Sequence, residues 1–191
     1  MDLAPFGSVD ASSLRWLRGN VSPLEFALLA GDTGVAGLVW NGPTGSLATA
    51  RTSASSWTLK RAGFLNPHVS VRAEGTRTET ARLTVHWTYH RLEIEGGPAF
   101  RFHRAGVLLP AWKVTDEAGQ ELVHIEPVRE GRKLVGGAVV TSPAGLDRPE
   151  LPLLLLVSWY FIVLAWFEDE ALVPLEGPDA PTATPGAPRT T

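Results

Sequence analysis

Six arginine side chains between residues 72 and 104 are the groups in this sequence best suited to bind a ligand, because guanidinium forks match phosphate oxygens. Residues 51–104 hold nine Lys or Arg against four Asp or Glu, whereas residues 149–191 hold one Arg against six acids. A basic half of this kind can face a phosphate-bearing partner. The other interpretation is that these arginines are the water-facing positions of strands. The predicted anionic head-group site consists of Arg72, Arg77, Arg82, Arg91, Arg101 and Arg104.

Aromatic residues lie close to these arginines in the sequence but alternate with charged ones. Trp87, Phe100 and Phe102 are therefore predicted to point to the opposite, buried face of the strands. Binding of single-stranded nucleic acid needs exposed aromatic side chains among the basic ones. We expect no nucleic-acid partner, and we expect an anionic phospholipid or a membrane surface instead.

The other polar groups do not form a recognisable catalytic or metal site. His86 and His90 are four residues apart, but the segment reads as a strand and a turn, and a metal needs three or four converging ligands. Glu93 and Glu95 share a strand face about 7 Å apart, where neighbouring arginines can pair with them. The Gly-Asp-Thr-Gly at 31–34 reads as a turn. We assign no catalytic residue, metal or cofactor.

Short segments of alternating apolar and polar residues make up most of the chain. Leu83 and Val85 alternate with Arg82 and Thr84, and the same pattern recurs in residues 68–72, 91–95 and 100–103. Strands with one apolar and one wet face are typical of antiparallel sheets. We predict about ten to twelve strands, with the clearest hairpin at residues 112–125. The glycine pair at 136–137 indicates a bulge or a close approach of another segment.

Residues 151–167 form a run that is apolar on every face of a helix, which protein or lipid must therefore surround. The run is about 25 Å long as a helix, at the lower edge of what crosses ~30 Å of hydrocarbon. Its flanks carry little positive-inside signal, which favours protein. Asp147 as N-cap, with Glu150 three residues later, predicts the start of the helix.

A barrel of one-sided strands closed around this helix satisfies both patterns, because the barrel is too wide for its own side chains to fill. We predict a β-rich (α+β) fold, a closed antiparallel β-barrel of about twelve strands wrapped around a hydrophobic C-terminal helix. The expected organisation is a lead-in at 1–21, the barrel at 22–172 with its helix at 150–169, and a disordered Pro/Thr/Ala-rich tail at 173–191. The absence of Cys and of a leader pattern favours a cytoplasmic protein, one that can lie peripherally on a membrane.

The order of elements, the hairpin Trp112-Lys-Val-Thr-Asp-Glu-Ala-Gly-Gln-Glu-Leu-Val-His-Ile125 and the terminal helix at 151–167 resemble the tubby C-terminal-like superfamily. That superfamily includes tubby domains, LURP-one-related proteins and phospholipid scramblases. The resemblance implies a twelve-stranded barrel around a hydrophobic helix and basic residues that bind phosphoinositide head groups. The chain has no Cys, unlike the Cys-rich segment of scramblases, so calcium-driven scrambling is not expected.

These patterns lead first to a non-enzymatic tubby-like domain that binds anionic lipid or another phosphate-bearing ligand at a membrane surface. The second hypothesis is a membrane-anchored protein with helix 151–167 in the bilayer and a separate β domain. The third is an enzyme whose site has no sequence signature. The sequence leaves the identity of the ligand and the oligomeric state open.

Overall fold

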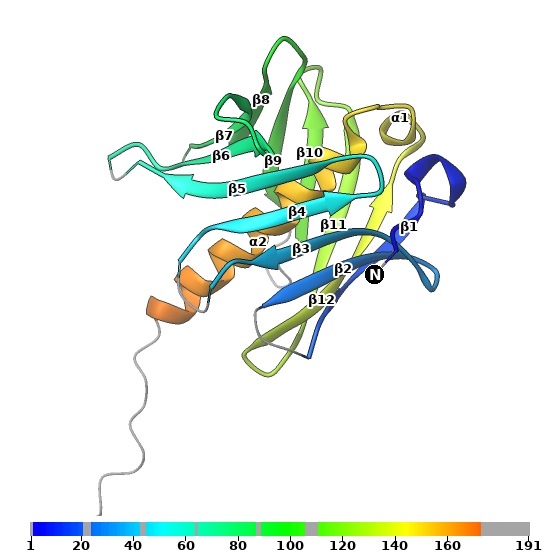
Figure 1. Cartoon of the computed structure of the whole chain (residues 1–191), viewed down its shortest axis with the longest axis horizontal. Coiled ribbons are helices and arrows are strands. Elements are labelled where there is room, and N and C mark those ends of the chain that lie inside the picture. Colours follow the sequence, from blue (N-terminus) through cyan, green and yellow to red (C-terminus); the bar gives the residue numbers. More distant parts are fainter. Residues whose placement is uncertain are drawn as a thin grey trace, which may run out of the picture.

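Twelve strands form a closed antiparallel barrel around one long helix in the computed structural model (Figure 1). The structure describes residues 2–20, 24–42, 45–63, 65–86, 89–105 and 111–172, with only the backbone for 168–172. The strands are β1 (Ser13–Arg18), β2 (Glu25–Ala30), β3 (Thr33–Trp40), β4 (Ala48–Thr52), β5 (Ser56–Ala62), β6 (His68–Ala73), β7 (Glu79–Val85), β8 (His90–Ile94), β9 (Ala99–Ala105), β10 (Ala111–Asp116), β11 (Glu121–Glu130) and β12 (Lys133–Thr141). The helices are η1 (Phe6–Ser8), α1 (Pro143–Leu146) and α2 (Leu151–Leu172).

Each strand pairs with its neighbours in the sequence, and the barrel closes where β1 pairs with β12. The predicted closed antiparallel barrel is confirmed. The barrel begins earlier than predicted, because β1 lies inside the segment assigned as a lead-in, residues 1–21. The alternation in β1 is the reason: Leu14 and Trp16 point inward, whereas Ser13 and Arg15 are exposed. The predicted disordered tail, 173–191, lies outside the described residues.

Helix α2 runs through the barrel and is enclosed on all sides. Residues 153–160 are all buried, and eight consecutive residues cover every face of a helix. Protein therefore surrounds this apolar segment, as the barrel prediction requires, and the structure does not place the segment in a bilayer. Within the described residues, none of the helices combines the length and the apolar character needed to cross a membrane.

Aromatic side chains fix the helix against the wall. The Trp159 ring stacks on Trp16 with centroids 5.4 Å apart and meets Phe26 edge-on at 5.3 Å. A Cβ atom on Gly137 would lie 2.7 Å from the Trp159 ring. Glycine at this position therefore makes room for the tryptophan pair, and the close approach predicted at residues 136–137 is confirmed.

The chain enters the helix through a separate short helix rather than through the predicted N-cap. Asp147 follows α1 and has helical backbone angles, φ −76° and ψ −5°, whereas an N-cap needs an extended backbone. The prediction of Asp147 as N-cap is therefore wrong. Pro149 disfavours a helical conformation at the residue before it. The Leu154 N–H donates to the Glu150 carbonyl at 2.9 Å, so α2 begins directly after Glu150.

Candidate functional site

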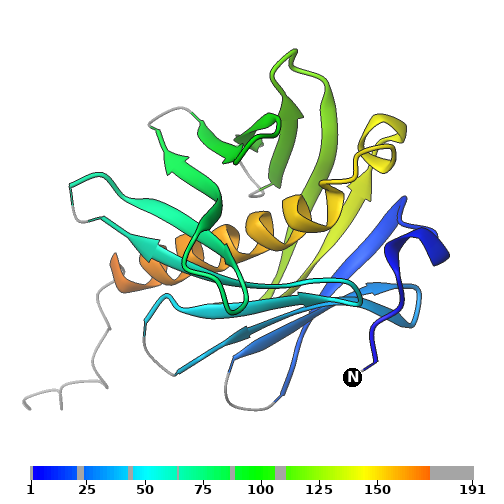
Figure 2. The ribbon, with the colours of Figure 1, turned by 45° about the horizontal axis from the view of Figure 1, so that its top comes forward.

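Antiparallel strands alternate in direction, so successive connections lie at opposite ends of the barrel. The two ends therefore consist of different residues and differ in composition. The end that we call capped carries α1 and the described connections at 31–32, 53–55, 74–78, 95–98, 117–120 and 142–150. The end that we call open carries the other connections and surrounds the C-terminal part of α2. Figure 2 shows α1 and the last turns of α2 at opposite ends of the molecule.

The six predicted site arginines do not form one patch. Arg77 lies in the connection between β6 and β7, at the capped end, and Arg72 lies near the end of β6 beside it. Arg104 lies near the opposite, open end of β9. It pairs in register with Trp112, and it shares the strand parity of the buried Phe100 and Phe102 rather than that of Arg101. The six residues therefore do not share one face of the barrel, and their role in binding an anionic head group stays a prediction.

Arg82, on the outer wall, is paired with a carboxylate of its own strand. Its Nε donates to Glu79 Oε2 at 3.0 Å and its Nη2 donates to the same oxygen at 2.5 Å. Partial burial opposes ionisation of Glu79, but hydrogen bonds from Arg82 and Ser70 outweigh it and hold the pKa of Glu79 below its ordinary value. The hydrogen bond and the charge of Glu79 in turn raise the pKa of Arg82. A ligand phosphate would have to compete with this pair.

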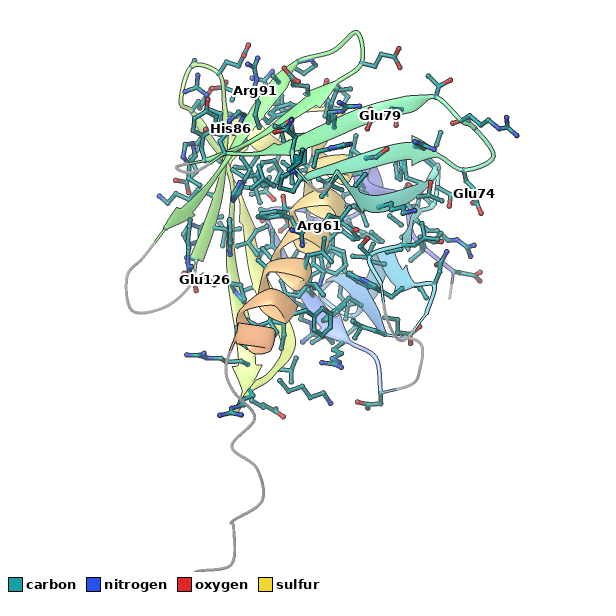
Figure 3. The ribbon with its side chains drawn as sticks, turned by 90° about the vertical axis from the view of Figure 1, so that its left-hand side faces the viewer. Arg61, Glu74, Glu79, His86, Arg91 and Glu126 are labelled. Carbon is teal, nitrogen blue, oxygen red and sulfur yellow. The ribbon has the colours of Figure 1, made fainter. Side chains whose placement is uncertain are left out.

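Arg91 and Arg101 are direct cross-strand neighbours on β8 and β9. Arg91 contacts Glu117 at 3.0 Å and Glu93 at 3.4 Å, whereas the Arg101 guanidinium lies over the Tyr89 ring, 5.6 Å from its centroid. Figure 3 shows Arg91 and Glu79 on the β7–β8 side of the barrel, well apart from Glu126. Three glutamates lie within ion-pair distance of Arg82 and Arg91, so the positive charge of this wall is smaller than the sequence count implies.

Two of the three aromatic residues predicted to face inward are described, and both are buried. Phe100 is 0% exposed and Phe102 is 1% exposed, as the alternation predicts. Trp87 lies outside the described residues.

A cavity of about 240 Å³ lies at the open end, where α2 leaves the barrel. Its basic side chains are Arg18, Arg132 and Lys133, from the end of β1 and the turn between β11 and β12. Its apolar side chains are Phe26, Leu134, Trp166 and Phe167. Positive charge beside aromatic and aliphatic surface suits a ligand with an anionic head and an apolar body.

Contacts between the elements hold the walls of this cavity in place. The Arg18 Nη1 donates to the Leu134 carbonyl at 3.2 Å, which joins β1 to β12. The Trp166 Nε1 donates to the Arg132 carbonyl at 3.1 Å, which joins the helix to the turn. The Arg129 guanidinium lies 5.7 Å from the Trp166 ring centroid. The basic turn and the aromatic end of the helix thus form one unit.

The distribution of basic residues along the sequence does not predict this cavity. Arg18 and Lys133 are 115 positions apart, and neither belongs to the arginine-rich segment that drew attention. One signal was available: Trp166 and Phe167 end the apolar run, and large aromatic side chains at a helix end favour an interface between apolar and polar surroundings. The pairing of β1 with β12 is needed to bring the basic residues to these rings.

His90 lies at the start of β8, between the wall and the helix. Its ring centroid is 4.4 Å from that of Phe161 and 5.9 Å from that of Trp112. Burial, with smaller contributions from His86 and His103, lowers the pKa of His90 to about 4. Its Nδ1 is buried and has no hydrogen-bond partner within the described residues. His90 is therefore neutral at physiological pH and packs as part of the core.

Tyr160 joins the helix to the wall near the open end. Its hydroxyl donates to the Ser46 carbonyl and accepts from the Arg61 backbone N–H at 3.0 Å. Burial raises the pKa of Tyr160 to about 12. These two bonds satisfy the hydroxyl group, and its role is to position α2.

Searches of family models, curated proteins and solved structures found nothing that matches this chain. A barrel around a helix is an architecture that does not by itself identify a superfamily. The tubby-like resemblance therefore stays a prediction.

Proposed function

We propose that this protein is a non-enzymatic binding domain of the tubby-like kind, cytoplasmic and peripheral to a membrane. Its ligand is an anionic phospholipid or another phosphate-bearing molecule at the membrane surface. The observation that carries the proposal is the cavity at the open end, where Arg18, Arg132 and Lys133 lie beside Trp166 and Phe167.

The chemistry of the cavity supports an anionic amphiphile. Three basic side chains from two separate segments converge on one opening. Guanidinium and ammonium groups bind phosphate oxygens strongly when they are partly shielded from water. The tryptophan and phenylalanine rings provide surface for the glycerol or acyl part of a lipid. The volume of about 240 Å³ accommodates a head group and not an entire lipid, so the chains would remain in the membrane.

The arginine wall supports the proposal less well. Arg82 and Arg91 are engaged by Glu79, Glu93 and Glu117. Such pairs reduce the net field that a membrane experiences. The wall therefore contributes long-range attraction and is not the binding site itself.

Sedimentation with vesicles tests this function. The bound fraction should rise with the phosphoinositide content of the vesicles and fall as salt is added, because the attraction is screened over about 10 Å at 0.1 M salt. Reversal of the cavity charges in Arg132→Glu/Lys133→Glu should abolish binding. The wall variant Arg82→Glu/Arg91→Glu/Arg101→Glu reverses three charges and should nevertheless weaken vesicle binding only in part.

A bound fraction that changes neither with the anionic lipid content nor with the salt concentration would overturn the proposal. If the wall variant loses binding and the cavity variant keeps it, the ligand binds on the wall instead. Circular dichroism of each variant checks that the barrel is intact.

A further inference from the structure

Exposed apolar side chains gather at one end of the barrel. Of the eight large hydrophobic residues exposed in the described part of the chain, six lie at or close to the open end: Leu17, Leu47, Leu65, Val85, Val128 and Phe167. The other two are Val140 and Leu146, near the capped end. Leu65, in the connection between β5 and β6, has 86% of its surface exposed to solvent. No packing requirement within the barrel explains a leucine in that position.

Two of these residues extend the apolar surface onto the outer wall. Leu17 and Val128 both pair in register with Gly136 of β12, one from each neighbouring strand. The exposed Leu17 and Val128 therefore lie on either side of a buried glycine, close to the turn that carries Arg132. Apolar surface thus continues from the cavity around its edge.

Basic residues are interleaved with this apolar surface. The basic residues in or within two positions of the open-end connections are Arg18, Arg61, Arg91, Arg104, Arg129, Arg132 and Lys133. The described acids in the same zone are Glu25 and Glu130. Helix α2 adds Glu168, Asp169 and Glu170 beyond Phe167.

The connections at the capped end have the opposite character. Their acids are Asp32, Glu74, Glu95, Glu117, Asp147 and Glu150, against Arg77 and Arg148. An anionic surface would repel this end. The barrel is thus polarised along the direction of its helix.

We propose that the open end is the face with which the barrel lies on an anionic lipid bilayer. Leu47, Leu65 and Phe167 enter the head-group region, while the basic residues between them contact lipid phosphates. The inference rests on the proposed function and adds to it an orientation: α2 points toward the membrane and α1 points away from it. Apolar side chains among basic ones are the combination that binds a protein to a charged interface.

A bilayer fits this end better than a second copy of the chain does. A face-to-face dimer would bring Arg18, Arg132 and Lys133 of both copies together, and their repulsion opposes such a contact. A bilayer offers apolar depth and negative charge at once, which matches both components of the surface.

The absence of cysteine allows a direct test of the orientation. Single cysteines in Leu65→Cys and Val140→Cys can be labelled with an environment-sensitive fluorophore such as NBD. Both positions are exposed, and they lie at opposite ends of the barrel. Vesicles of phosphatidylcholine with phosphoinositide should shift the emission of the label at position 65 to shorter wavelength and leave the label at position 140 unchanged. A shift at both positions or at position 140 alone would overturn the orientation.

Sedimentation tests the apolar contribution separately. Leu47→Ser/Leu65→Ser should weaken vesicle binding by about three- to tenfold, whereas the matched capped-end variant Val140→Ser/Leu146→Ser should not change it. If the serine variant at the open end binds vesicles as well as the wild type does, the proposed orientation is wrong. Concentration-dependent dimers that Leu65→Ser dissolves would also overturn it, in favour of self-association.

A soluble probe separates this failure from failure of the proposed function. Inositol hexakisphosphate should bind the wild type and Leu47→Ser/Leu65→Ser equally well in calorimetry, because it needs the basic residues and neither leucine lines the cavity. If inositol hexakisphosphate binds but the vesicle tests fail, the proposed phosphate site is supported and the proposed orientation is wrong. If neither the soluble phosphate nor anionic vesicles bind, both proposals fall.

Discussion

The capped and open ends of the barrel are built from the same strands but close in different ways. At the capped end, the Ser142 hydroxyl donates to the Glu121 carbonyl at 2.7 Å and accepts from the Gly145 N–H at 3.2 Å. The Arg148 Nη2 also donates to Asp116 Oδ2 at 3.1 Å. At the open end, the described contacts leave a cavity and a rim of exposed apolar side chains.

The difference indicates that contacts which stabilise the fold lie at the capped end of α2, whereas surface suited to binding a partner lies at its open end. Ser142 and Arg148 at the capped end have specific partners, which is how a fold orients a chain segment. Apolar groups at the open end stay in contact with water, which costs free energy that folding alone does not recover. A surface with that cost is consistent with a partner that covers it.

The largest expected effect comes from removing what both ends share. Deletion of residues 149–191 takes away α2 and leaves the inward side chains of twelve strands without a partner. We expect the cooperative unfolding transition to disappear, with loss of near-ultraviolet circular dichroism. A truncated barrel that still unfolds cooperatively would show that the strands hold together without the helix, as the membrane-anchored hypothesis requires.

The next effect compares the middle of the helix with its exposed end. Trp159 is fully buried between Trp16 and Phe26, so Trp159→Ala should cost about 3–5 kcal/mol of unfolding free energy. Phe167 is 41% exposed, and Phe167→Ala should cost less than about 1 kcal/mol. Denaturant titration measures both. Comparable losses would mean that the open end also holds the fold together.

Two ion pairs at the capped end test whether its polar contacts are specific. The Asp116 side chain is 14% exposed, bonds Arg148, and also accepts from the Gln120 N–H at 2.9 Å. Asp116→Ala should therefore cost about 1–3 kcal/mol. The matched control is Asp32→Ala, because Asp32 pairs with Arg15 at 2.8 Å but is fully exposed, and its loss should not be measurable. Equal effects of the two variants would contradict the role given to burial.

The smallest effect is a pH dependence at the open end. His90 has a folded pKa of about 4 and an ordinary value of 6.5, so the unfolded chain takes up a proton that the folded barrel excludes. Stability from neutral His90 is complete above about pH 6.5 and is lost as the pH falls toward 4. Because the ring keeps some contact with water, we expect a loss of about 1–2 kcal/mol. In His90→Gln this part of the acid slope should vanish, and an unchanged slope would assign it to other groups.

Most of the architecture could be predicted from local patterns, and two boundaries could not. Alternation at period two identifies the inward face of a strand, and a run such as 153–160 identifies a helix that must be enclosed. The first strand was missed because Leu17, an apolar residue at an exposed position, interrupts the alternation in β1. The helix start was misplaced because Asp147 fits a capping pattern, but Pro149 disfavours the helical conformation that Arg148 would need in a helix beginning after Asp147.

The candidate site was much less predictable than the fold. The arginines that stand out in the sequence are placed by register, and register put Glu93 beside Arg82 and Arg101 beside Arg91. Cross-strand neighbours are non-local, so a count of charges along the chain does not reveal which charges are neutralised.

By itself, the sequence determined that one-sided strands must enclose an all-round apolar helix, because burial of apolar surface is the dominant favourable term in folding. Only the tertiary structure decided where charge and exposed apolar surface meet. Closure of β1 onto β12 brings Arg18 to Lys133, and the length of α2 carries Trp166 to the same opening. The positions of Arg18, Lys133 and Trp166 relative to one another depend on the closure of the entire barrel and not on any one segment.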